Sequence, residues 1–170
     1  MSQYNQWMNQ KIYQAAKDLG DREIKEDRGA FFDSILGTLN HIYIADIIWL
    51  RRFARHSKQY QNLKDLPELP SYTNLKEIAA NNIEDLSQLR QALDAKIIAW
   101  CEEIKPVDLE RSLNYTDTKN NPYCKNFGQL VHHLFNHQTH HRGQASTLFS
   151  QQGIDIGVTD LLKIIPEQLN

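Results

Sequence analysis

The sequence predicts an all-α protein in which four long helices form a bundle. Three observations favour this fold class: apolar residues recur at helical spacing in four long segments, signals for β-strands are few, and the 170 residues include only 7 glycines and 5 prolines. So few glycines and prolines favour long uninterrupted elements. A chain of this length is most simply one domain, residues 1–170, and can bury a sizeable core.

The first predicted helix begins near Tyr4 and ends at Gly20, because glycine commonly follows the last helical turn. Its apolar residues recur at intervals of three and four: Tyr4, Trp7, Met8, Ile12, Ala15, Ala16 and Leu19. We expect its polar face, which includes Asn5 and Asn9, to lie in solvent. The charged segment 21–29 is expected to be a loop.

The second predicted helix spans about residues 30–57 and carries a wide apolar surface. The segment 59–72 loses this periodicity and contains two prolines, which predicts a connection. A third helix is expected to begin at Asn74, which can cap it together with Glu77 three residues later, and to end before Pro106.

In the remaining third of the chain, the sequence predicts a small hairpin or irregular excursion, then one long helix, then a short C-terminal helix. Residues 112–126 combine polar and aromatic residues with a proline, as in a small hairpin or an irregular excursion. The fourth long helix is expected over about 127–152, ending at Gly153, and a short C-terminal helix over 160–168. The connections between helices are long enough to leave the order of neighbours open.

Cysteine usage and apolar patterning predict a soluble, cytoplasmic protein. The two cysteines, Cys101 and Cys124, do not form a disulfide framework, and neither has a metal-binding CxxC partner. The N-terminus lacks the pattern of a signal peptide. The most apolar run, residues 42–50, is interrupted by Asp46 and is far shorter than the roughly 20 residues of a membrane-spanning helix. We therefore expect no membrane partner.

The charge balance gives no reason to expect a nucleic-acid partner. The formal net charge is -2, whereas nucleic-acid-binding proteins present a basic face. One short basic patch lies near the end of the second helix: Arg51, Arg52, Arg55 and Lys58. Such a patch is more typical of a solvated helix end.

A histidine cluster in the last long helix predicts a metal site. Residues 132–144 hold five of the seven histidines, and His137 and His141 stand four apart, so that their rings share one helix face. Both fall on the apolar stripe of this helix: Phe127, Leu130, Leu134, His137, His141, Ala145 and Leu148. A buried imidazole needs a hydrogen-bond partner or a metal ion.

A third ligand is expected from another helix, because one helix face cannot surround an ion. Catalytic sites commonly use three protein ligands and keep one position open for water or substrate. Outside the cluster the candidates are His41, in the middle of the second helix, and His56, near its end. A solvated position is more typical for His56, which favours His41. Histidines four apart also occur on surfaces or as hydrogen-bonded core groups.

The other polar residues of the cluster have separate interpretations. His132 and His140 lie off the apolar stripe and are expected at the surface. His133, one turn before His137, is expected to line the same cavity as a hydrogen-bonding neighbour, and Gln144 to support His141 or to edge a polar pocket.

Arg142 has two interpretations, and Gly143 has one. Arg142 either binds the carboxylate of a ligand or, as we favour, forms a surface or structural salt bridge. Gly143 lowers helix stability by about 1 kcal/mol relative to alanine, so we expect it to allow close packing against a neighbouring helix.

Two common metalloenzyme classes do not fit the cluster. A zinc peptidase of the HExxH type has glutamate directly after its first histidine, and here that residue is Gln138. A di-iron bundle needs carboxylates on facing helices, and the cluster contains neither aspartate nor glutamate.

Three segments closely resemble the DinB/YfiT-like family of bacterial proteins: YNQWMN at 4–9, LNHIYIADIIWL at 39–50 and HQTHHRGQ at 137–144. The resemblance extends over nearly the whole chain. It implies a four-helix bundle, often dimeric, that holds a divalent metal ion through three histidines. Carried over residue by residue, it assigns this role to His41, His137 and His141.

The resemblance also implies the chemistry. Better-understood members of the family are metal-dependent transferases that join low-molecular-weight thiols to electrophiles, or thiol-dependent isomerases. This implies a Zn or Ni cofactor, a thiol and an electrophilic small molecule as partners, and a homodimer. The alternative is a non-catalytic, dimeric metal-binding protein of the stress response.

Overall fold

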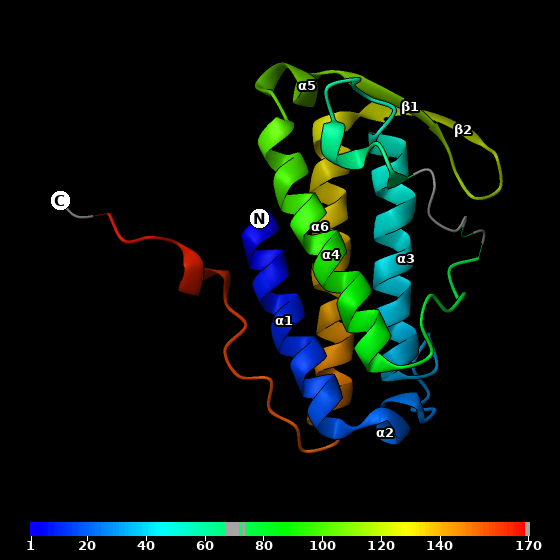
Figure 1. Cartoon of the computed structure of the whole chain (residues 1–170), viewed down its shortest axis with the longest axis vertical. Helices are drawn as coiled ribbons and strands as arrows, with labels where there is room; N and C mark the ends of the chain where they lie inside the picture. Colours follow the sequence, from blue (N-terminus) through cyan, green and yellow to red (C-terminus); the bar gives the residue numbers. More distant parts are fainter. Residues whose placement is uncertain (67–71, 73, 169–170) are drawn as a thin grey trace.

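The computed structural model of this chain describes residues 1–66, 72 and 74–168. Four long helices lie side by side (Figure 1): α1 (Ser2–Leu19), α3 (Ile35–Phe53), α4 (Ile83–Glu103) and α6 (Phe127–Ser150). The shorter elements are α2 (Asp21–Lys25), the 3-10 turn η1 (Gln61–Leu63), α5 (Pro106–Glu110), the strands β1 (Ser112–Thr116) and β2 (Pro122–Asn126), and the 3-10 turn η3 (Leu161–Ile164).

The chain is mostly helical, as the sequence predicts, and also contains a small two-stranded sheet. β1 and β2 pair antiparallel with Asn114 opposite Cys124, so the expected excursion before the last long helix is a hairpin. Within the described ranges, no helix is both long enough and apolar enough to cross a membrane.

The first two helices differ from expectation at their ends. α1 ends before Gly20 as predicted, but the segment expected to be a loop contains α2, whose one buried residue is Ile24. That single apolar contact gives no periodic signal in the sequence. α3 begins five residues later than expected because Ser34 caps it, its side chain accepting a hydrogen bond from the Gly37 N–H, and it ends at Phe53.

The third long helix begins at Ile83, and the prediction of a start at Asn74 is wrong. Asn74 and Glu77 do form a local hydrogen bond of 2.6 Å, but no helix follows them. Asn40 of α3 binds this segment instead, because its side-chain oxygen accepts hydrogen bonds from the backbone N–H groups of Ala79 and Ala80. Backbone groups bound in this way cannot enter a helical ladder.

The last long helix agrees with its predicted span, whereas the expected C-terminal helix does not form. α6 begins at Phe127 and ends two residues before the predicted limit. The segment 160–168 contains only the turn η3, whose residues are all exposed. A turn with no buried residue lacks the tertiary packing that stabilises most short helices.

The four long helices enclose a polar cluster as well as an apolar core. Asp46 of α3 and Asp94 of α4 flank Arg90, whose nitrogens lie 2.6 Å and 2.9 Å from their carboxylate oxygens. Asn9 donates to Asp94, and Arg142 of α6 donates to the side-chain oxygens of Asn5 and Asn9: all six residues are at most 3% exposed. The two cationic and two anionic side chains balance one another.

This cluster corrects two expectations. Asn5 and Asn9, expected in solvent, are buried because the side of α1 that carries them faces α4 and α6. Arg142, for which a salt bridge was favoured, bonds neutral oxygens of asparagine, glutamine and threonine side chains. A buried guanidinium needs such acceptors because leaving it unpaired costs several kcal/mol.

The change Asp46→Ala is expected to lower the free energy of unfolding by about 3 kcal/mol, because it removes the closer partner of a buried charge. Asp65→Ala, which breaks the ion pair of an aspartate that is 63% exposed, should cost less than about 1 kcal/mol. Denaturant unfolding monitored by circular dichroism measures both. Similar losses in the two variants would contradict a stabilising role for the buried cluster.

Two helical glycines have opposite surroundings. A Cβ added at Gly37 would lie 2.1 Å from the backbone oxygen of Phe32, so this glycine permits the close approach of the turn before α3. A Cβ added at Gly143 would meet nothing within 4 Å, so the expectation that Gly143 packs tightly against a neighbouring helix is wrong.

Alanine substitution of these glycines should therefore change stability in opposite directions. Gly37→Ala is expected to destabilise the fold by about 1–3 kcal/mol through overpacking. Gly143→Ala should stabilise it by up to about 1 kcal/mol, because alanine has the higher helix propensity. Thermal and denaturant unfolding test both changes, and a stabilised Gly37→Ala variant would show that the close approach is unimportant.

Candidate metal centre

Three histidines from two helices meet at one point. His41 projects from α3, and His137 and His141 project from α6, which runs in the opposite direction beside it (Figure 1). The Nε2 atom of His41 lies 3.3 Å from that of His137 and 3.2 Å from that of His141. The Nε2 atoms of His137 and His141 are 3.1 Å apart. This group of three can hold a metal ion.

Hydrogen bonds on the outer ring nitrogens fix the protonation of two of these rings. The Nδ1 atom of His41 lies 3.2 Å from the carbonyl oxygen of Leu75, and that of His141 lies 2.7 Å from Oε1 of Gln144. Because both oxygens are acceptors, each Nδ1 carries the proton and each Nε2 presents a lone pair to the shared centre. Two lone pairs that face each other at 3.2 Å repel unless a cation lies between them.

The spacing of the three nitrogens fits a small divalent cation. Imidazole nitrogens bind zinc at about 2.0–2.1 Å, so two nitrogens of a tetrahedral site lie about 3.3 Å apart, and two adjacent nitrogens of an octahedral site about 3.0 Å apart. The separations of 3.1–3.3 Å lie within this interval. The three residues therefore match the donor type and the spacing of a metal site.

Partial burial keeps the three rings neutral and able to bind a metal. Burial, followed by the effect of His141, lowers the pKa of His41 to about 4. Burial is also the main reason why the pKa of His137 falls to about 3, with smaller contributions from the neighbouring histidines. Burial lowers the pKa of His141 too, against the opposing effect of the Gln144 hydrogen bond.

Phe32 closes one side of the histidine group. Its ring stacks on His41 with centroids 3.8 Å apart and meets His141 edge-on at 5.6 Å. Beyond Phe32 lies a mainly apolar hollow of about 240 Å³ between the start of α3 and the end of α6. Its lining residues are Ala30, Phe31, Phe32, Thr38, Gln144, Thr147 and Leu148.

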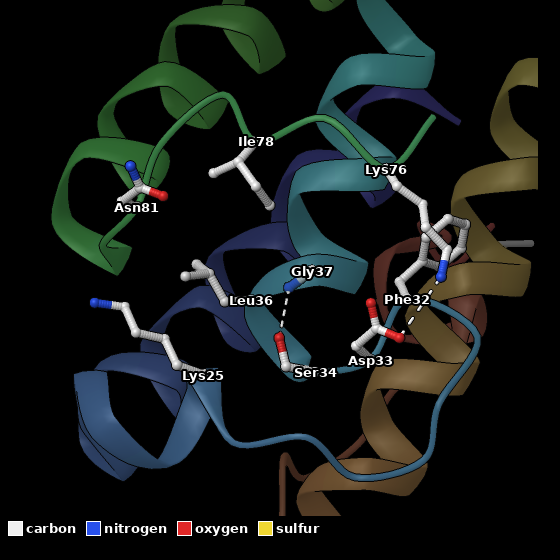
Figure 2. A pocket seen from close by; sticks show the side chains of 9 residues that line it. All are labelled: Lys25, Phe32, Asp33, Ser34, Leu36, Gly37, Lys76, Ile78 and Asn81. Atoms are coloured by element: carbon white, nitrogen blue, oxygen red, sulfur yellow. Dashed lines mark hydrogen bonds and ion pairs between the residues drawn. The ribbon is translucent and has the colours of Figure 1, made fainter. Parts of the chain in front are cut away.

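A larger hollow of about 400 Å³ lies on the other side of Phe32, around the N-terminal end of α3 (Figure 2). Figure 2 shows the ion pair of Lys76 with Asp33 on one side of this hollow, and Lys25 and Asn81 on the other. None of its lining residues is a histidine. No histidine lines the smaller hollow either, but Gln144, which bonds His141, does, so the smaller hollow is the one adjoining His141.

Aromatic side chains lie on the opposite side of the histidine group. The ring of His133 is 5.8 Å from that of His137 and 5.1 Å from that of Trp49, two turns beyond His41 on α3. Trp49 in turn contacts Tyr115 of β1 at 5.3 Å. The hairpin therefore brings a third element to this side of the group.

Three other histidines lie outside this group, although the ring of His140 meets that of His141 edge-on with centroids 4.8 Å apart. His132 and His140 are exposed, as expected. His56, expected on a solvated face, is half-buried: its ring stacks on Phe127 at 3.9 Å, and its Nε2 atom lies 3.1 Å from the carbonyl oxygen of Asp108. It thus fastens the end of α3 to α5.

Several residues around the site have no clear signal in the sequence. Phe32 lies in the turn before α3, and the Leu75 carbonyl belongs to a segment predicted to be helical. The polar cluster had one visible sign, since Asp46 interrupts the most apolar run of the chain. Its partner Arg90 occupies a buried position of α4, but helical spacing alone does not pair the two.

Comparison with known proteins agrees with these features. The chain matches the DinB family over residues 1–168. It is 27% identical over 159 residues to Protein DinB of Bacillus subtilis (strain 168), an alignment that covers 93% of this chain and 87% of that protein. No solved structure matches. Because the family match extends over nearly every residue, we conclude that the chain belongs to the DinB family.

Proposed function

We propose that His41, His137 and His141 bind one divalent metal ion, Zn or Ni, and that the protein is an enzyme that transfers a low-molecular-weight thiol to an electrophile. The convergence of three Nε2 atoms within 3.3 Å supports the metal site. The family resemblance supports the reaction class. Three imidazole ligands suit either ion.

The make-up of the site favours catalysis over a purely structural role. Structural zinc sites commonly have four protein ligands, whereas catalytic sites have three and an open position. In the described part of the chain the group has three members, and His137 and His141 are only half-buried. A bound divalent cation would stabilise the thiolate form of a thiol that reaches the open position.

The surrounding residues fit a transfer reaction. Gln144 and the Leu75 carbonyl orient two of the rings through their Nδ1 protons. The apolar hollow beyond Phe32 can receive the hydrocarbon part of an electrophile while excluding water. In the proposed reaction the sulfur forms a bond to the electrophilic carbon, the leaving group departs with its electron pair, and the thiol proton passes to solvent.

A non-catalytic role is the second candidate, because the histidine group joins α3 to α6. A metal ion held there would tie the two helices together, as in a metal-binding stress protein without enzymatic activity. For either role we also propose the four-helix bundle and homodimer of the family, a cytoplasmic location, and no nucleic-acid or membrane partner. The side-by-side packing of α1, α3, α4 and α6 supports the bundle (Figure 1).

The purified protein is expected to bind about one Zn or Ni ion per chain. Alanine substitution of His41, His137 or His141 should each weaken binding by more than about 100-fold, because loss of a ligand's hydrogen-bond partner alone costs about 10–100-fold. His132→Ala is the matched control, since that ring is exposed on the same helix. Elemental analysis and competition with a chelator measure the effect, and full binding by all three variants would refute the site.

The variant His41→Ala also distinguishes catalysis from a structural role. If the site is catalytic, the variant should lose thiol transfer to model electrophiles while its melting temperature changes by only a few degrees. If the site is structural, the melting temperature should fall steeply in a protein whose parent transfers no thiol. A panel of thiols and electrophiles, assayed beside thermal unfolding, provides both measurements.

A further inference from the structure

We propose that Arg52 binds the carboxylate of the low-molecular-weight thiol, on the side of the histidine group formed by Trp49, His133 and Tyr115. This inference rests on the proposed function, because it assumes that a thiol is the ligand. It extends that function by assigning a binding residue and by requiring a thiol that carries an anionic group.

The Arg52 guanidinium lies against two aromatic rings. Its central carbon is 4.5 Å from the centroid of Trp49 and 5.0 Å from that of Tyr115. Arg52 extends from the last turn of α3, and Tyr115 belongs to β1. Contact with two rings from separate elements restricts the orientation of the planar guanidinium and so prepares it to bind a planar carboxylate.

The hydrogen-bonding capacity of this guanidinium remains available for a ligand. Among the described residues, no oxygen accepts a hydrogen bond from Arg52 and no carboxylate lies in salt-bridge distance of it. The side chain is half-buried, which lowers its pKa through desolvation, yet it remains the cationic partner that a carboxylate would seek. A half-buried arginine with unpaired donors gains more from an anion than a fully solvated one does.

The other arginines near the histidine group or the end of α3 are less suitable. Arg142 is 3% exposed, and its donors are bonded to side chains of α1 and α6. Arg51 donates to the Leu66 carbonyl oxygen at 2.9 Å. Arg55 is exposed in the turn after α3 and has no aromatic platform among the contacts of the described residues.

A continuous row of rings connects Arg52 to the histidine group. From the guanidinium the row passes through Trp49 to His133, 5.1 Å away, and from His133 to His137, a further 5.8 Å away. Because these steps follow the rings, they set only an upper limit on the straight-line distance from the guanidinium to the histidine group. A ligand that contacts both ends is expected to be a thiol of at least tripeptide size, since three extended residues span about 10 Å.

The charges around this row favour an anionic ligand. Lys125 of β2 lies over the ring of Tyr123, 5.2 Å from its centroid, and Tyr123 stacks on Tyr115. Lys125 is also close enough to His133 to contribute to the lowering of its pKa. Asp117 is close enough to act on Arg52, raising its pKa against the effect of desolvation, but its carboxylate oxygens accept hydrogen bonds within the hairpin turn. Two cations therefore face the row from α3 and from the hairpin.

The test uses the Co(II)-substituted full-length protein and two probes, glutathione and glutathione diethyl ester, which share the thiol but differ in their carboxylates. The sulfur-to-cobalt charge-transfer band reports binding of each probe. Arg52→Gln should weaken glutathione binding by roughly tenfold to a hundredfold, the effect of losing a charge-assisted hydrogen-bonding pair. Arg55→Gln is the matched control and should bind like the parent protein.

The ester provides the decisive comparison. We expect it to bind the parent protein more weakly than glutathione does, and to bind Arg52→Gln and the parent equally. The proposal would be overturned if Arg52→Gln bound glutathione as the parent does, or lost affinity for both probes equally. Cobalt stoichiometry and thermal unfolding verify that the variant is folded. Absence of the band with either probe in the parent protein would overturn the proposed function, and the assignment of Arg52 with it.

Discussion

The candidate metal centre depends on the close approach of three imidazole Nε2 atoms, which cannot all be paired with one another by hydrogen bonds. The Leu75 carbonyl oxygen and Oε1 of Gln144 accept hydrogen bonds from the Nδ1–H groups of His41 and His141. The Nε2 lone pairs of these two rings therefore face each other at 3.2 Å. Such an arrangement is unfavourable without a cation at its centre. The packing of α3 against α6 maintains it, because the histidines project from helices that are anchored by the core along their whole length. The fold therefore supplies the free energy that holds the ligands in place.

The last long helix, α6, contributes residues both to the histidine group and to the buried polar cluster. His137 and His141 face α3, while Arg142, one position further along, donates to the buried asparagines of α1 and to Gln138 of its own helix. This division follows from helical geometry, since residues four apart share a face and adjacent residues diverge by about 100°. The polar cluster thus fixes the rotation of α6 about its axis. The same rotation directs the two histidines toward His41.

The two sides of the histidine group offer different chemistry to a ligand. Phe32 and the apolar hollow beyond it lie toward the start of α3, whereas Trp49, His133 and Arg52 lie toward its end. An apolar group and an anionic group can therefore approach the same centre from opposite directions. A site of this kind suits a reaction between two small molecules of unlike polarity, as in the proposed thiol transfer.

The sequence alone determined the long helices and the histidine spacing, because helical periodicity and an i, i+4 pair are local properties of the chain. It placed α1 and α6 nearly to the residue and favoured His41 over His56 by its position in the middle of a helix. Only the tertiary structure decided the start of α4, the burial of Asn5 and Asn9, and the roles of Phe32 and Arg142. Each of these depends on partners distant in the chain, such as Asn40 capturing Ala79 and Ala80, and local patterns carry no information about which distant groups meet.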